Sequence, residues 1–143
     1  MAESPRRKAR ELALQALYAT EITENELDDT LDQVLVDETL SAKHIAFARS
    51  LVLLVREHSE WADQQITHLA TNWDLSRIAD IDRLILRIAL VEIKETPDTP
   101  VKVAINEAIE LAKKFSTAES SAFINGILDR YARDIAAAKP ESL

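Results

Sequence analysis

A single glycine, Gly126, is the feature of this 143-residue sequence that most restricts its fold. Tight β-hairpins need residues with positive φ, and glycine adopts such a backbone without steric cost. One glycine cannot supply the many turns of a multi-stranded antiparallel sheet. Aromatic residues make up only 5% of the chain, which also argues against a β-sandwich. The sequence therefore predicts an all-α protein, and its length suits one domain spanning residues 1–143.

Apolar residues that recur every three or four positions locate the expected helices. We expect helices over residues 5–20, 27–35, 41–69, 78–91, 101–115 and 117 to about 139. Ser4, Ser41 and Thr99 are suitable N-caps, and Pro5 and Pro100 suit the first helical position. Residues 116–119 (STAE) match a capping box in which Ser116 caps the last helix. The fourth segment is apolar on nearly every side, which predicts a buried central helix.

Several classes of protein are excluded by what the sequence lacks. Without cysteine there is no disulfide, no thiolate zinc site and no cysteine nucleophile. No apolar run approaches the roughly 20 residues that cross a bilayer, and the first residues do not read as a secretory signal. The three histidines, His44, His58 and His68, lack metal-ligand spacing, and one glycine cannot form a phosphate loop. We expect a soluble, cytoplasmic protein, and these residues indicate no catalytic, metal or cofactor site.

The basic start of an otherwise acidic chain is the main functional signal. The net charge is −8, yet the first ten residues carry four basic side chains and one acidic one. Cations in the first turn of a helix oppose its dipole, which suggests an anionic partner. Arg6, Arg7 and Arg10 share one flank, which Tyr18 continues. With free N–H groups at the helix start, these side chains predict a phosphate site for RNA or DNA. The alternative is a basic terminus that only aids solubility.

A second candidate surface lies along one edge of the last helix. Glu119, Phe123, Gly126 and Arg130 follow one another at helical spacing. An aromatic ring beside a guanidinium can stack an unpaired base, although Phe123 also suits an ordinary core position. At Gly126 either a ligand or backbone approaches closely, or two helices pack tightly.

Three blocks of sequence resemble the NusB family of bacterial transcription antitermination factors. The blocks are RRKARE from Arg6, IDRLILRIAL from Ile81, and VKVAINEAIELAK from Val101 with FINGILD from Phe123. The resemblance extends over essentially the whole chain. It implies a compact all-α fold of about six to seven helices in two packed subdomains, and a role without catalysis.

The resemblance also implies partners and site residues. NusB proteins bind single-stranded boxA RNA together with NusE, a ribosomal protein of the small subunit. With other Nus factors they help RNA polymerase read through terminators in ribosomal RNA operons. Carried over by position, the RNA-binding residues are Arg6, Arg7, Arg10, Glu119, Ser120 and Phe123, and the NusE-facing residues are Tyr18 and Asp82. Two positions depart from the family pattern. Many relatives have arginine where this sequence has Lys8, and some have lysine where it has Ala122.

Two other functions fit the same sequence. One is a helical protein-binding adaptor, or a homodimer that hides the arginine-bearing helix, without specific RNA binding. The other is a stand-alone relative of the RNA-binding domain found in ribosomal RNA cytosine methyltransferases. The methyltransferase half itself would need a Gly-rich cofactor loop and a cysteine nucleophile, which this sequence lacks.

Overall fold

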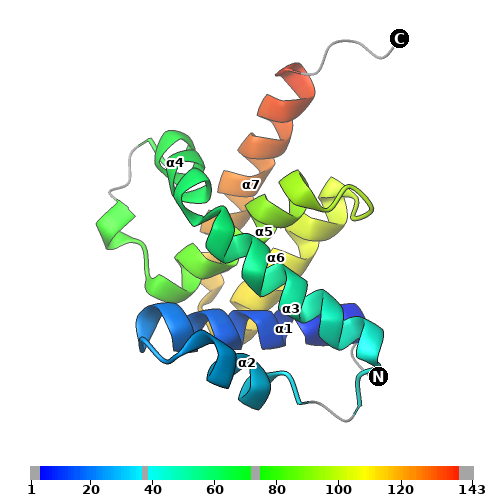
Figure 1. Ribbon diagram of the computed structural model, residues 1–143. Coiled ribbons are helices and arrows are strands. Elements are labelled where there is room, and N and C mark those ends of the chain that lie inside the picture. The colour runs from blue at the N-terminus through cyan, green and yellow to red at the C-terminus, as the bar shows by residue number, and fades with distance from the viewer. Residues whose placement is uncertain (1–3, 37–38, 72–74, 139–143) are drawn as a thin grey trace. The chain divides into compact units, whose positions relative to one another are not determined.

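Every regular element is helical in the computed structural model, which describes residues 4–36, 39–71 and 75–138 (Figure 1). The described α-helices are α1 (Pro5–Leu17), α2 (Leu27–Val34), α3 (Ala42–Glu57), α4 (Ser59–Leu69), α5 (Asp80–Glu95), α6 (Val101–Phe115) and α7 (Ala118–Ala138). A π-helical turn, η1 (Tyr18–Ile22), extends α1, and a 3₁₀ turn, η2 (Leu75–Arg77), precedes α5. The all-α prediction is confirmed. No helix in the described part of the chain is both long and apolar enough to span a membrane.

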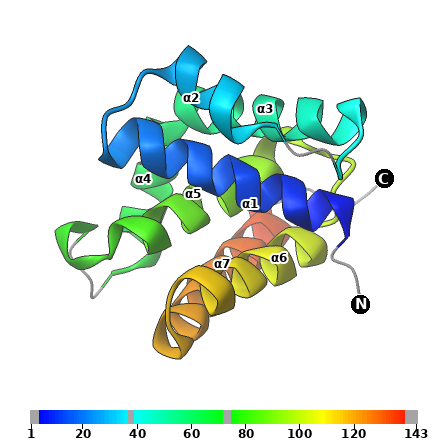
Figure 2. The same ribbon diagram turned by 90° about the horizontal axis from the view of Figure 1, so that it is seen from below.

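Contacts divide the chain into two compact units, Met1–Ser59 and Glu60–Leu143. In the first unit, α1 lies beside α3, and α2 contacts α1 (Figures 1 and 2). The apolar stripe expected on α1 is buried, and so is the facing stripe of α3. The buried residues are Ala9, Leu12, Ala13, Ala16 and Leu17 on α1, and Ala48, Leu51, Val52 and Val55 on α3. The many alanines of α1 leave room for a neighbouring helix to approach closely.

The second unit is built around α5. Its residues from Leu84 to Glu92 are buried except Arg87, so the predicted buried central helix is confirmed. Helices α6 and α7 pack along each other, and both contact α5 (Figure 2). Leu84, Ile85, Leu86 and Leu90 are fully buried on α5, as are Ile124 and Leu128 on α7. Burial also raises the pKa of the Tyr131 phenol above its ordinary value.

The prediction of one long helix over residues 41–69 is wrong. Helix α3 ends at Glu57, and α4 begins at Ser59. At His58 the backbone leaves helical geometry, with φ −104° and ψ 15°. The Ser59 hydroxyl donates to the Arg56 carbonyl at 3.2 Å. Such local side-chain bonds compete with the helical ladder, and the apolar period continues across the break without revealing it.

Two of the four expected N-caps are confirmed. The hydroxyls of Ser4 and Ser41 accept hydrogen bonds from the third residues of α1 and α3, at 3.1 and 3.4 Å. The predictions for Thr99 and Ser116 are wrong, because Pro100 is the residue before α6 and Thr117 is the residue before α7.

The two misplaced caps have different local causes. The Thr99 N–H donates to the Thr96 carbonyl, which places Thr99 in the preceding turn, and Pro100 precedes α6. The Thr117 hydroxyl, rather than that of Ser116, accepts a hydrogen bond from the Ser120 N–H of α7, at 3.0 Å. Adjacent Ser and Thr offer equivalent oxygens, so the capping motif does not choose between them. The expected end of the last helix near Lys139 lies outside the described residues.

Candidate nucleic-acid interface

The start of α1 carries the three predicted arginines, within the first unit. Its backbone has little to offer an anion. Pro5 has no N–H, and the Arg7 N–H already donates to the Ser4 hydroxyl at 3.1 Å. At most Arg6 has a backbone N–H available among the first three residues of the helix. The predicted contribution of several free N–H groups is therefore wrong, and a phosphate here would be bound mainly by side chains.

The three arginine side chains differ in their surroundings. The Arg6 guanidinium carbon lies 4.0 Å from the centre of the Phe47 ring on α3, and that of Arg10 lies 5.4 Å from it. Arg10 is only 3% exposed, whereas Arg6 and Arg7 are half-buried. Helical periodicity placed all three arginines on one flank but did not separate the buried one from the others. The role of Phe47 was also missed, because the sequence pattern assigns it to the apolar stripe of its own helix.

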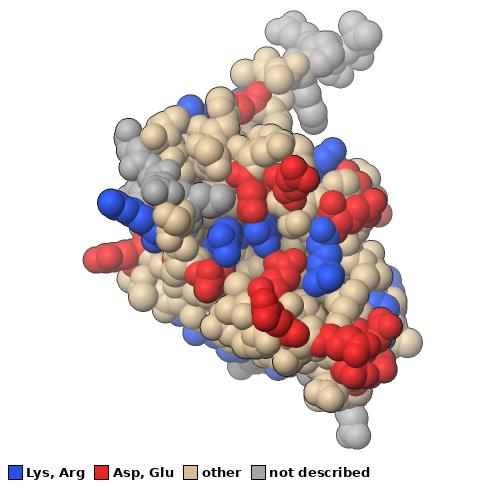
Figure 3. All heavy atoms as spheres, turned by 60° about the vertical axis from the view of Figure 1, so that its left-hand side comes forward, with Lys and Arg blue, Asp and Glu red and all other residues tan. Residues whose placement is uncertain are grey.

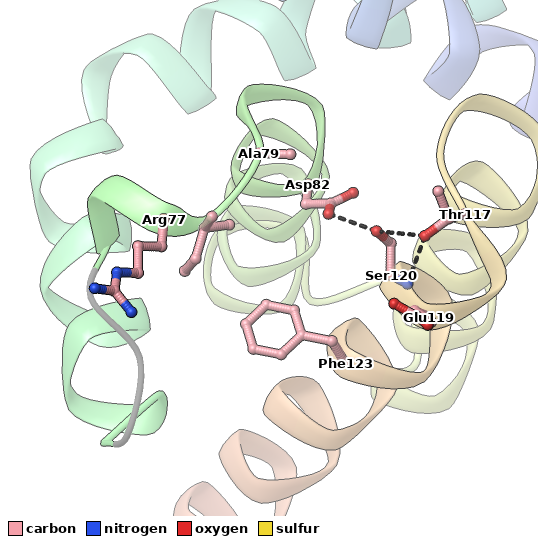
Figure 4. A pocket seen from close by; sticks show the side chains of 8 residues that line it. Arg77, Ala79, Asp82, Thr117, Glu119, Ser120 and Phe123 are labelled. Atoms are coloured by element: carbon pink, nitrogen blue, oxygen red, sulfur yellow. Dashed lines mark hydrogen bonds between the residues drawn. The ribbon is translucent and has the colours of Figure 1, made fainter.

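A pocket of about 210 Å³ lies in the second unit, beside the first turns of α5 and α7 (Figure 4). Its lining includes Arg77, Asp82, Thr117, Glu119, Ser120 and Phe123. The Phe123 ring points across the pocket toward the turn that bears Arg77, as Figure 4 shows. The arrangement combines an aromatic surface, a cation and several hydrogen-bonding groups. It can therefore accept a flat, polar group such as a base, or a side chain of a protein.

A chain of hydrogen bonds closes one side of this pocket. The Ser120 hydroxyl donates to Asp82 Oδ2 at 2.6 Å, and the Thr117 hydroxyl donates to Ser120 Oγ at 3.0 Å. Asp82 is only 6% exposed, and its Oδ1 is buried without a hydrogen-bond partner among the described residues. The bonds join the start of α7 to α5 although Asp82 and Ser120 are 38 positions apart. They keep the first turn of α7 in place beneath Phe123.

The pocket groups the predicted residues in a new way. Glu119, Ser120 and Phe123 lie together, as expected for one binding surface. Asp82, which the family resemblance assigned to the NusE-facing surface, lines the same pocket. Tyr18, its expected companion, is 39% exposed at the start of η1 in the first unit. Arg77 was missed, because a lone arginine in a short turn before a helix carries no periodic signal.

The expected stacking partnership between Phe123 and Arg130 is replaced by a structural role for the arginine. Arg130 Nη1 donates to the carbonyl oxygen of Leu69, the last residue of α4, at 3.0 Å. The position of Gly126 is open: a Cβ atom there would meet nothing within 4 Å. The prediction that two helices pack closely at Gly126 is therefore wrong. Instead the glycine lines a second shallow hollow next to Phe123.

Charge is unevenly distributed over the surface. Figure 3 shows one face, on which acidic and basic side chains both occur in local groups. With a net charge of −8, the chain offers anions only local cationic groups. Within the described ranges no group of three or more His, Asp or Glu side chains is placed to hold a metal ion.

The fold places the chain in a class, that of small all-α proteins built from two helical units. Comparison with known proteins is more specific. The model of the NusB family matches residues 7–133. A transcription antitermination protein NusB of Symbiobacterium thermophilum is 47% identical over 131 residues, with 86% of each chain covered. The chain belongs to the NusB family.

Solved structures agree with this assignment. The structure of T. maritima NusB matches with a TM-score of 0.82 and 35% identity, covering 92% of this chain and 93% of the other. A structure described as antitermination factors NusB and NusE in complex with dsRNA matches with a TM-score of 0.78 and 20% identity, covering 88% of this chain and 94% of the other. The second likeness is one of fold.

Proposed function

We propose that this chain acts in transcription antitermination by binding single-stranded boxA-type RNA together with a NusE-type ribosomal protein. The observation that carries the proposal is the arginine-bearing start of α1 in a chain of net charge −8. A relative that is 47% identical is a transcription antitermination protein, and a solved structure of the same fold holds NusB and NusE in complex with dsRNA. The chain works in the cytoplasm with RNA polymerase and other Nus factors, as an adaptor without catalysis, metal or cofactor.

The positions of the side chains suggest which of them contact phosphates, a base and NusE. Arg6 and Arg7 are partly exposed and contact phosphates, while the buried Arg10 supports the charge behind them. In the second unit Phe123 stacks on a base, and Glu119 and Ser120 supply hydrogen bonds next to it. Tyr18 and Asp82 belong to the NusE-facing surface, and the pocket brings Asp82 within reach of the RNA-binding residues.

The acidic body limits the strength of RNA binding. Three to four phosphate contacts to a single strand give a slope of log K against log salt of roughly −2 to −3. We therefore expect modest affinity for RNA alone, and tighter binding when NusE adds its own contacts. The gain with NusE should be largest for the specific RNA, because phosphate contacts do not distinguish sequences.

Fluorescence anisotropy of a labelled boxA RNA and a scrambled control, with and without NusE and at two salt concentrations, tests the proposal. We expect tighter binding to boxA, strengthened by NusE and weakened by salt. Equal, weak binding of both RNAs would favour a protein-binding adaptor. Light scattering of the free chain over a concentration series then tests whether a homodimer hides the arginine-bearing helix.

Substitution of Arg6, Arg7 and Arg10 by alanine should abolish RNA binding. The matched control replaces Lys102, Lys113 and Arg133, which are exposed in the second unit, and removes the same charge. Because Arg10 is buried, circular dichroism must confirm folding of the first variant. Retained NusE binding together with unchanged RNA affinity in the first variant would reject the arginine site.

A further inference from the structure

We propose that Phe47 is a positioning residue for RNA binding: it holds the Arg6 guanidinium over its ring and so presents it to a backbone phosphate. The inference rests on the proposed function, because it assigns a support to one of the phosphate contacts. Nothing in the sequence pattern singles out Phe47, which lies 41 positions from Arg6 on another helix of the same unit.

The geometry of the contact leaves the arginine free to bind an anion. The guanidinium carbon is 4.0 Å from the ring centre, the distance of a direct cation–π contact. All five donors of a guanidinium lie in its own plane. A guanidinium held by an aromatic ring therefore keeps its N–H groups for another partner, whereas a carboxylate would occupy them. Among the described residues the Arg6 side chain contacts the Phe47 ring and no carboxylate.

The ring itself is held on a rigid element. Helix α3 is capped by Ser41, and the residue after Phe47, Ala48, is fully buried against the core of the first unit. Helix α3 packs along α1, the helix that carries Arg6. The ring is thus a fixed platform, while the long arginine side chain would otherwise sample many rotamers. Fixing it before RNA arrives lowers the entropic cost of the phosphate contact.

A second cation shares the platform. The Arg10 guanidinium lies 5.4 Å from the same ring centre. Arg10 is only 3% exposed, so Arg6 is the one of these two side chains that the ring can present at the surface.

Anisotropy with boxA RNA tests the inference in four variants: Phe47→Leu, Phe47→Tyr, Arg6→Ala and the double variant Phe47→Leu with Arg6→Ala. Loss of the cation–π contact should weaken RNA binding about two- to fivefold in Phe47→Leu, and Phe47→Tyr should restore it. Arg6→Ala should weaken binding about tenfold. The fold-loss of affinity in the double variant should be smaller than the product of the two single losses, because both substitutions remove the same contact.

The salt dependence separates positioning from direct contact. Arg6→Ala should reduce the magnitude of the salt slope by about 0.7, because one phosphate contact is lost. Phe47→Leu should leave the slope unchanged, since Arg6 still reaches the phosphate. Leu53→Ala, a substitution of an exposed apolar residue on the same helix, is the matched control and should leave the affinity unchanged. NusE affinity and the melting temperature show whether Phe47→Leu disturbs the fold.

The outcomes distinguish this inference from the proposed function. If Arg6→Ala weakens RNA binding and Phe47→Leu does not, the positioning role is overturned while the function stands. Independent, multiplying effects of the two substitutions, or an equal loss in Phe47→Tyr, also overturn it. If neither variant changes the affinity, Arg6 makes no phosphate contact and the inference is overturned, while the variant that replaces all three arginines still tests the proposed function.

Discussion

Two arginines, one in each unit, differ in the kind of group that their side chains contact. In the second unit, Arg87 Nε and Nη2 donate to Asp63 Oδ1 at 2.8 Å and Oδ2 at 2.6 Å. The pair joins α5 to α4, with side-chain exposures of only 11% and 28%. In the first unit, Arg6 rests on the Phe47 ring. A carboxylate occupies the donors of its arginine, and a ring leaves them available. The partner, rather than the residue type, decides which arginine holds the fold and which can bind a ligand.

The largest effect on stability should follow from breaking the pair in the second unit. Arg87→Met leaves the partly buried Asp63 carboxylate without its partner, so we expect a loss of about 2–4 kcal/mol in the free energy of unfolding. Arg6→Ala should change it by less than about 0.5 kcal/mol. Urea denaturation followed by circular dichroism measures both. Equal losses in the two variants would contradict the contrast between the units.

Removing one N-cap in each unit should have a smaller and unequal effect. Ser4→Ala removes the cap of α1 and should cost about 1 kcal/mol. Thr117→Ala should cost more, about 1–2 kcal/mol, because its hydroxyl also donates to Ser120, which in turn bonds to Asp82. Thr117→Ser keeps the oxygen and serves as the control. Equal losses in the two alanine variants would mean that the network adds nothing to the cap.

The smallest expected effect is a gain in stability. Gly126→Ala should raise the free energy of unfolding by about 0.5–1 kcal/mol, because the added methyl group meets no atom and alanine favours the helix. Ala122→Gly, four residues earlier on the same exposed side of α7, should lower it by a similar amount. A loss of stability in Gly126→Ala would show that the hollow at this position is filled in solution.

Local chemistry accounts for the features that the sequence predicted well. The apolar stripes of α1, α5 and α7 depend on neighbours three or four positions away, and the caps at Ser4 and Ser41 depend on the next turn. Such interactions lie within a few residues of one another. The same local view fails where two choices are close in energy. It missed the break at His58 and chose Ser116 instead of Thr117 as a cap.

The candidate site was predictable only in part. The basic start of the chain and the grouping of Glu119, Ser120 and Phe123 could be predicted, because each lies within one short segment. The burial of Arg10 and the approach of Asp82 to Ser120 could not. Both depend on which residues of another helix lie opposite. Helical spacing predicts only which side of its own helix a residue lies on.

The sequence by itself determined that the chain is helical, where its apolar faces lie and that its positive charge gathers at one helix start. Tertiary structure alone decided that Arg6 meets an aromatic ring and that Asp82 meets Ser120. The physical reason is the range of the forces involved. Backbone propensity, capping and periodicity act over one or two helical turns. A cation–π contact between residues 41 positions apart, or a hydrogen bond between residues 38 apart, exists only once the helices have packed.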